Sequence, residues 1–242
     1  MISFEAAAVV APGGTTILHP TTLELAERRI SIIGANGSGK STLARLVNGL
    51  VEPSTGAVRV QGLDATLLGA TLLDTPFLDT VRDGAAVRRA VGFVFTNPDA
   101  QLIMPTAIED VELSLRRTHP DKRSRRAAAL AVLERFGIGE LADQSVHTLS
   151  GGQRQLLAIA SVLSVDPAVL VADEPTTLLD LRNSLRIGDL LMSLPQQVIV
   201  VTHDLGLAAR ADRTLVVDGG RVVFDGTPGE AIAAYRERAE AA

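Results

Sequence analysis

Apolar residues occur along this chain in two alternating patterns. Continuous apolar runs, such as 168–172 and 198–201, are typical of strands that are buried on both faces. Other segments, such as 121–136, carry apolar residues every three or four positions, and this spacing is typical of a helix with one buried face. Because the two patterns alternate, the chain is predicted to be an α/β protein with a parallel sheet covered by helices.

Glycine, proline and the period of the apolar residues set the predicted boundaries of the elements. The predicted strands are 29–33, 58–60, 91–95, 168–172, 197–202, 214–218 and 221–224, and Phe4 belongs to a further one. The predicted helices are 40–49, 108–117, 121–136, 153–165, 179–194, 205–211 and a last helix from Pro228. Residues 63–83 fit a loop insertion or a short helix, a surface loop is the favoured prediction, and no function is assigned to them.

Composition narrows the classes of protein to which the chain can belong. Its 242 residues, 46% of them hydrophobic, are predicted to form one domain, 1–242, with a sizeable core. The chain has no cysteine, which excludes thiol catalysis and Cys-ligated metals. Its net charge of -5 and its aromatic content of 3% argue against a nucleic-acid partner. No stretch approaches the roughly 18 consecutive apolar residues of a membrane span, and the first residues show no signal-peptide pattern.

A glycine-rich segment follows the predicted strand 29–33 and opens the predicted helix 40–49. It matches the pattern G-x-x-x-x-G-K-[ST], in which the backbone N–H groups of a glycine-rich loop surround nucleotide phosphates. Lys40 is predicted to neutralise the β- and γ-phosphate oxygens, and the Ser41 hydroxyl is predicted to coordinate Mg²⁺. The residues predicted to bind ATP in this segment are Gly34, Ala35, Asn36, Gly37, Ser38, Gly39, Lys40, Ser41 and Thr42.

Two acidic residues follow the buried run 168–172. Because buried strands end at the catalytic edge of an α/β sheet, Asp173 is placed to hold Mg²⁺, directly or through water. Glu174 lies one residue further and is predicted to orient or deprotonate a water molecule that attacks the γ-phosphate. An acidic turn after a strand is also a common structural feature, so this pair alone does not select a function.

The pentapeptide Leu-Ser-Gly-Gly-Gln, residues 149–153, leads into the predicted helix 153–165. Two adjacent glycines at a helix N-terminus make a second site for an anion, and Ser150 adds a hydroxyl. With this segment the sequence resembles the nucleotide-binding subunit of ATP-binding cassette (ABC) transporters. The resemblance implies four further ATP-binding residues, namely Ser150, Gly151, Gly152 and Gln153.

The resemblance also implies a fold and a dimer. The fold is a P-loop NTPase (RecA-like) core with a mostly parallel sheet, an N-terminal antiparallel β subdomain and a helical subdomain, about 97–165, that carries LSGGQ. In the family two chains sandwich two ATP molecules head to tail, so a homodimer or a paired ATPase chain is expected. Residues 177–180 correspond to the family's D-loop, with Asp180 at the dimer seam. His203 corresponds to the catalytic switch histidine, which contacts the γ-phosphate.

Residues 91–102 and 105–111 are similar to the energy-coupling-factor (ECF) ATPases of vitamin and of cobalt or nickel importers. Most of those ATPases have glutamine where this chain has Thr96, and the shorter hydroxyl would contact Mg²⁺ only through a water. The chain is most similar to the biotin-transporter ATPases in three places. These are Thr96, residues 27–30, and residues 176–180, which read Thr-Thr-Leu-Leu-Asp where many cassettes have Thr-Ala-Gly-Leu-Asp. The cobalt or nickel importers come next.

The ECF resemblance implies membrane partners and a location. The partners are a transmembrane coupling subunit and a substrate-binding membrane subunit. A groove lined by residues 96–112 is expected to transmit conformational change to the helices of the coupling subunit. The chain would then lie peripherally at the cytoplasmic face of the inner membrane.

Two other classes of function compete with the transporter subunit. A soluble cassette ATPase of iron–sulfur cluster assembly has a compatible length, and the ECF-like segment 97–111 argues against it. A small-molecule P-loop kinase would explain neither LSGGQ nor His203. The sequence also lacks the aromatic residue on which family members usually stack adenine, so Val9 or Val10 is predicted to take its place.

Overall fold

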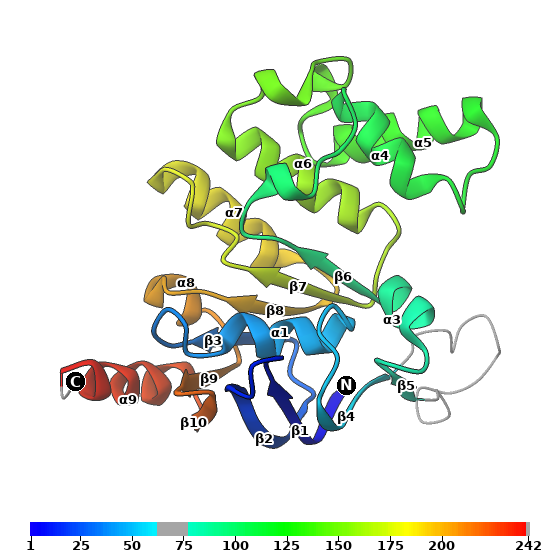
Figure 1. Ribbon diagram of the computed structural model, residues 1–242. Helices are drawn as coiled ribbons and strands as arrows, with labels where there is room; N and C mark the ends of the chain where they lie inside the picture. Colours follow the sequence, from blue (N-terminus) through cyan, green and yellow to red (C-terminus); the bar gives the residue numbers. More distant parts are fainter. Residues whose placement is uncertain (62–76, 241–242) are drawn as a thin grey trace.

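The computed structural model describes residues 1–61 and 77–240, which form two sheets and a layer of helices (Figure 1). The larger sheet has six strands in the order β10-β9-β3-β8-β7-β6, and all its pairings are parallel except that of β10 with β9. Its strands are β3 (Arg29–Ile33), β6 (Val91–Val94), β7 (Val169–Asp173), β8 (Gln197–Val201), β9 (Arg213–Asp218) and β10 (Arg221–Gly226). The predicted, mostly parallel sheet is therefore confirmed.

A smaller antiparallel sheet has the strand order β2-β1-β4-β5, and β3 of the larger sheet lies between β2 and β4 in the sequence. Its strands are β1 (Ile2–Val10), β2 (Thr16–Leu25), β4 (Thr55–Gln61) and β5 (Phe77–Asp79). The side chain of Phe4 is buried in β1, as predicted. β5 lies inside the segment that was predicted to be a surface loop, 63–83, and residues 63–76 of that segment lie outside the described residues.

Helix α1 (Lys40–Asn48) lies between the two sheets (Figure 1). Its apolar face, including Leu43 and Leu46, belongs to a core cluster that contains Phe4 from the small sheet and Ile32 from the large one. This packing fixes the N-terminus of α1 close to the end of β3, with only the loop 34–39 between them. The end of a parallel strand and the start of a helix therefore meet at one point, which is the geometry that a phosphate site requires.

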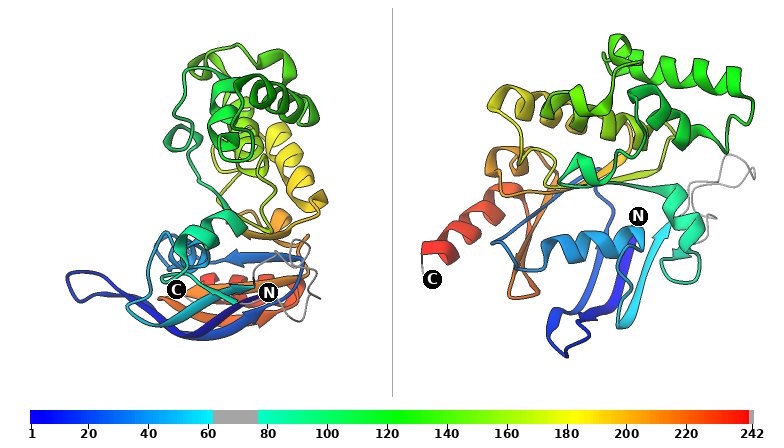
Figure 2. Two further views of the ribbon diagram at one scale, coloured as in Figure 1. Left: turned by 90° about the vertical axis from the view of Figure 1, so that its right-hand side faces the viewer. Right: turned by 45° about the horizontal axis from the view of Figure 1, so that its top comes forward.

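A layer of helices covers the other face of the large sheet, away from α1 (Figure 2). Three of them lie within the predicted segment 97–165, and buried Ile108, Val111 and Leu157 share their core. No helix in the described part of the chain is long and apolar enough to cross a bilayer. The helices of this layer are α4 (Ala107–Leu115), α5 (Lys122–Arg135), α6 (Gly151–Leu163) and α7 (Leu181–Ser193).

The remaining helices are short or peripheral. α3 was not predicted because only Val87 of its seven residues is buried, which leaves no helical period to detect. At the C-terminal end, α9 packs on Ile33 and Val216 through Ala231. The bounds are α3 (Gly84–Ala90), α8 (Leu205–Ala208), α9 (Pro228–Glu240) and the 3₁₀ turns η2 (Pro98–Ala100), η3 (Gly139–Leu141) and η4 (Val146–Thr148).

Candidate functional site

The loop between β3 and α1 adopts a backbone that only glycine permits at two positions. Gly34 has φ 151°, and a Cβ there would lie 2.0 Å from the carbonyl oxygen of Val217. Gly39 has φ 103°, and a Cβ there would lie 3.0 Å from the carbonyl oxygen of Ile17. β9 and β2 therefore press on this loop, and a side chain at either glycine would force their backbones apart.

Lys40 begins α1, and its side chain is almost fully buried. Its Nζ donates hydrogen bonds of 2.8 Å to the carbonyl oxygens of Gly34 and of Ala35, so the ammonium closes the glycine-rich loop. Burial lowers the pKa of Lys40 from its ordinary value, while the carboxylates of Glu174 and Asp173 act in the opposite direction. The ammonium is thus held at the mouth of the loop, where it can exchange carbonyl partners for phosphate oxygens.

The rest of the loop also fits a phosphate group. The buried Ser38 Oγ has no hydrogen-bond partner among the described residues. The N-terminus of α1 has no side-chain cap, so its first N–H groups can bind an anion. Ala35, Asn36 and Gly37 are exposed at the tip. The predicted ATP-binding segment therefore presents hydrogen-bond donors that could surround a phosphate group.

A hydroxyl and a carboxylate meet beside Lys40. Ser41 Oγ donates to Asp173 Oδ1 at 2.8 Å, and Asp173 is 1% exposed at the end of β7. Oxygen ligands of this kind are those that Mg²⁺ prefers, and Mg²⁺ commonly takes only one or two from the protein because phosphates and water supply the others. No cluster of three or more His, Cys, Asp and Glu residues occurs elsewhere in the described chain to hold a metal.

Arg45 contacts the same carboxylate and was not singled out from the sequence. Its Nη2 lies 3.1 Å from Asp173 Oδ2. Ser41 and Arg45 are one turn apart on α1, so both face β7. That spacing of four residues is the signal that could have identified Arg45.

Glu174 has a left-handed backbone, with φ 52°, which is uncommon for a residue that has a side chain. His203 follows β8 after Thr202, and its Nδ1 lies 2.7 Å from Glu174 Oε2. Thr177 donates to the same oxygen at 2.9 Å. The structure therefore brings the two predicted catalytic residues into direct contact, a pairing that the sequence did not reveal.

Thr96 lies two residues past Val94, the last residue of β6 that pairs with β7. Val94 is opposite Ala172, so Thr96 lies at the same edge of the sheet as Asp173. Its side chain is half-buried. Its role as an Mg²⁺ ligand stays a prediction.

The LSGGQ segment forms the start of α6. Ser150 Oγ accepts from the N–H of Gln153 at 3.3 Å, and Gln153 Oε1 accepts from the N–H of Ser150 at 2.8 Å. This capping box starts the helix at Gly151, so the boundary predicted at Gln153 was two residues late. In the described chain no hydrogen bond joins these residues to the loop 34–39, which is the arrangement expected if LSGGQ serves another subunit.

Asp180 caps α7 rather than pointing free into solvent. Its Oδ1 accepts from the N–H of Asn183 at 2.8 Å, so α7 begins at Leu181 and the prediction of 179 was early. Asn183 in turn fills the space beside Gly152, where a Cβ would lie 2.6 Å from its carboxamide. The D-loop and LSGGQ segments therefore pack together on one side of the molecule.

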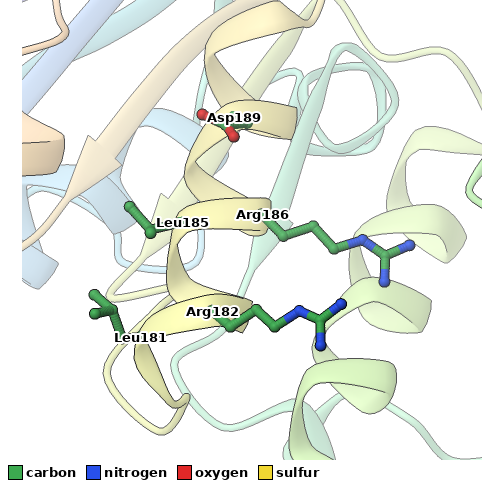
Figure 3. A pocket seen from close by; sticks show the side chains of 5 residues that line it. All are labelled: Leu181, Arg182, Leu185, Arg186 and Asp189. Atoms are coloured by element: carbon green, nitrogen blue, oxygen red, sulfur yellow. The ribbon is translucent and has the colours of Figure 1, made fainter.

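An apolar surface adjoins Asp180. Leu178, Leu181 and Leu185 are 64%, 76% and 57% exposed, and they follow one another at helical spacing. In Figure 3 the two leucines of α7 point away from Arg182 and Arg186. Large apolar side chains exposed together commonly mark a protein contact.

The structure narrows one of the predictions about binding surfaces. Val9 is 6% exposed and belongs to the core between the sheets, so it cannot contact adenine, whereas Val10 is 42% exposed. A hollow of about 660 Å³ lies beside the Thr96 region, and its lining includes Phe93, Phe95 and Val162. Ile108 and Val111 of the segment 96–112 are buried in a core shared with α6. The groove expected over 96–112 stays a prediction.

Fold and site together define the class of the protein. A glycine-rich loop with a buried lysine joins the parallel strand β3 to helix α1. A serine on that helix contacts an acidic residue at the end of β7, which is separated from β3 in the sheet by β8. These features make the protein a P-loop NTPase. Residues 18–177 match the ABC transporter family. The chain belongs to that family, and it is an ABC ATPase of the energy-coupling-factor type.

Two relatives show how much of the chain this similarity covers. A Deinococcus radiodurans protein, provisionally assigned as an ABC transporter ATP-binding protein, is 46% identical over 92% of each chain. The biotin transport ATP-binding protein BioM of Rhizobium etli is 42% identical over 98% of each chain.

Solved structures agree with the fold. CbiO1 of Clostridium perfringens, part of the ABC transporter complex CbiONQ, matches with a TM-score of 0.80 and 31% identity over 98% of this chain and 92% of its own. The cassette MJ0796, solved as a dimer bound to ADP and phosphate, matches with a TM-score of 0.78 and 29% identity over 94% of this chain and 99% of its own.

Proposed function

We propose that this chain is the ATP-hydrolysing, energy-coupling subunit of an ECF-type importer whose substrate is biotin. The observation that carries the ATPase assignment is the convergence of Lys40, Ser41, Asp173, Glu174 and His203 at one edge of the parallel sheet. The similarity to BioM over nearly the whole of both chains supports biotin. No residue of an ATPase subunit is expected to touch the vitamin, so the cargo rests on that similarity.

Different residues of the chain bind the phosphates, hold the metal and activate the attacking water. The N–H groups of 34–39 and the Lys40 ammonium bind the β- and γ-phosphates. Ser41 and Asp173 would hold Mg²⁺, which would neutralise phosphate charge, and Thr96 is a further candidate ligand through a water. Glu174 orients the attacking water and accepts its proton, and His203 holds the Glu174 carboxylate and faces the γ-phosphate.

A second copy or a related chain completes the site. The LSGGQ residues make no hydrogen bond to the phosphate loop of their own chain among the described residues. Ser150 to Gln153 would instead bind the γ-phosphate that the partner's phosphate loop holds. Leu178, Leu181 and Leu185 continue the exposed surface that begins at the D-loop and fit a seam with that partner. The dimeric state of MJ0796 supports this arrangement.

Membrane subunits would bind at the hollow between α3, β6, α4 and α6. Its lining includes the aromatic residues Phe93 and Phe95 and the exposed cations Arg88, Arg89 and Arg117. Phe95 precedes Thr96 directly, so a helix seated there would lie next to the Mg²⁺ edge of the sheet. A peripheral place at the cytoplasmic face of the inner membrane follows, with a coupling subunit and a substrate-binding subunit as partners.

The test is uptake of radiolabelled biotin by the cells that encode this chain. Deleting its gene should abolish the uptake, the intact chain should restore it, and the Lys40→Ala variant should not. The chain should also co-purify with a multi-spanning membrane protein in mild detergent. Loss of cobalt or nickel uptake with normal biotin uptake would assign the metal importers instead, and purification without any membrane protein would favour a soluble cassette ATPase.

A further inference from the structure

The carboxylate of Glu174 is held from two directions at one of its oxygens. His203 Nδ1 lies 2.7 Å from Oε2, and Thr177 Oγ1 lies 2.9 Å from the same atom. An ionised carboxylate has no proton to give, so the Thr177 hydroxyl is the donor in its contact. The Glu174 side chain is only 14% exposed, which leaves it little freedom to exchange these partners for water.

Two hydrogen-bond donors to one carboxylate oxygen restrict the orientation of the Glu174 side chain more than a single donor does. The last torsion of a glutamate side chain is broad, so a single hydrogen bond leaves the carboxylate plane free to rotate. A second donor from a different element restricts that rotation and thereby aims the other oxygen, Oε1. No described side chain donates to Oε1, which leaves it as the oxygen that can accept a proton.

The Thr177 hydroxyl is itself held in place. The N–H of Thr177 donates to the carbonyl oxygen of Glu174 at 3.3 Å, which closes a tight turn over 174–177. The turn starts from the left-handed backbone of Glu174. From the other side, Ser184 Oγ on α7 lies 3.3 Å from the carbonyl oxygen of Thr176 and 3.4 Å from that of Leu179. The hydroxyl therefore comes from a segment that is anchored at both ends.

We infer that Thr177 is a positioning residue for ATP hydrolysis, which orients the Glu174 carboxylate through its hydroxyl. The inference rests on the proposed role of Glu174 as the group that accepts the proton from water. It also assigns the D-loop a function within its own chain. Because Thr177 lies three residues before Asp180, the segment that reaches the expected dimer seam also sets the orientation of the catalytic carboxylate.

The test compares Thr177→Val, which keeps the branched shape and removes the hydroxyl, with Thr177→Ser, which keeps the hydroxyl. Because a hydrogen bond to a charged group is removed, kcat for ATP hydrolysis should fall about tenfold in Thr177→Val. KM should stay within about twofold, since the hydrogen bond of the Thr177 hydroxyl goes to Glu174 and not to the phosphate loop 34–39. Thr177→Ser should retain at least about half of the kcat. Thermal melting curves of both variants should match that of the unchanged protein.

Two controls separate positioning from a structural effect. Ser193→Ala removes a hydroxyl from the other end of α7, where it donates to the carbonyl oxygen of Leu190, and its kcat should stay within about twofold of the unchanged protein. In a Glu174→Gln background, Thr177→Val should cause no further loss, because residues that act through one another are not additive.

Any of four results would overturn the inference. These are a normal kcat in Thr177→Val, an equal loss in Thr177→Ser, an equal loss in Ser193→Ala, and a further tenfold loss in the double variant. Failure of the proposed function is a different outcome, because it would show as near-normal hydrolysis by Glu174→Gln alone.

Discussion

Glu174→Gln is expected to slow ATP hydrolysis by at least about a hundredfold, the lower end of the usual contribution of a general base. The amide has the shape of the carboxylate, and its oxygen can still accept from Thr177 and His203, so the local structure should persist. What the variant loses is the ability to accept a proton from water. ATP affinity should therefore stay unchanged, as measured by titration calorimetry beside single-turnover hydrolysis.

Glu237→Gln is the matched control for that experiment. Glu237 is exposed on α9, far along the chain from the strand ends that carry the site, and the same chemical change there should leave kcat unaltered. Near-normal turnover in Glu174→Gln would remove Glu174 from its role. The contact with His203 would then be structural only.

Lys40→Ala should raise the dissociation constant for ATP by about a hundredfold or more, because it removes charge-assisted contacts to phosphate oxygens. The side chain is almost fully buried and lies over the loop that should hold the phosphates. The loss should appear in the binding step itself, and binding of a fluorescent ATP analogue would measure it.

Lys122 is the only other lysine in the chain, which makes Lys122→Ala the natural comparison. It lies exposed at the start of α5 and should leave nucleotide affinity unchanged. Melting in the absence of nucleotide would check that the glycine-rich loop tolerates the loss of the Lys40 contacts. Normal ATP affinity in Lys40→Ala would show that the phosphates bind elsewhere.

Contiguous motifs were the part of the site that the sequence predicted best. The glycine-rich loop needs a strand before it and a helix after it, and both could be identified from local spacing. The strand that ends in Asp173 was equally clear, because β7 is apolar up to its last residue and buried throughout. Helix starts were less exact, since the caps Ser150 and Asp180 act through side-chain hydrogen bonds that apolar spacing does not report.

Features that depend on side-chain orientation were missed or wrong. The bulges of β1 shift its register between Ala7 and Val10, so Ala7, Ala8 and Val9 are all buried and alternation no longer tells which valine faces out. The contacts of Arg45 with Asp173 and of His203 with Glu174 join residues far apart in the sequence, and only the packing of α1, β7 and β8 brings them together.

The central claim is that ATP completes a site shared between two chains. Analytical ultracentrifugation of the Glu174→Gln protein with saturating ATP and Mg²⁺ tests it most directly, because this variant should bind ATP without consuming it. The account predicts a shift from the 25.4 kDa monomer to a species of twice that mass, and no such shift with ADP. A protein that stays monomeric at saturating ATP would contradict the claim.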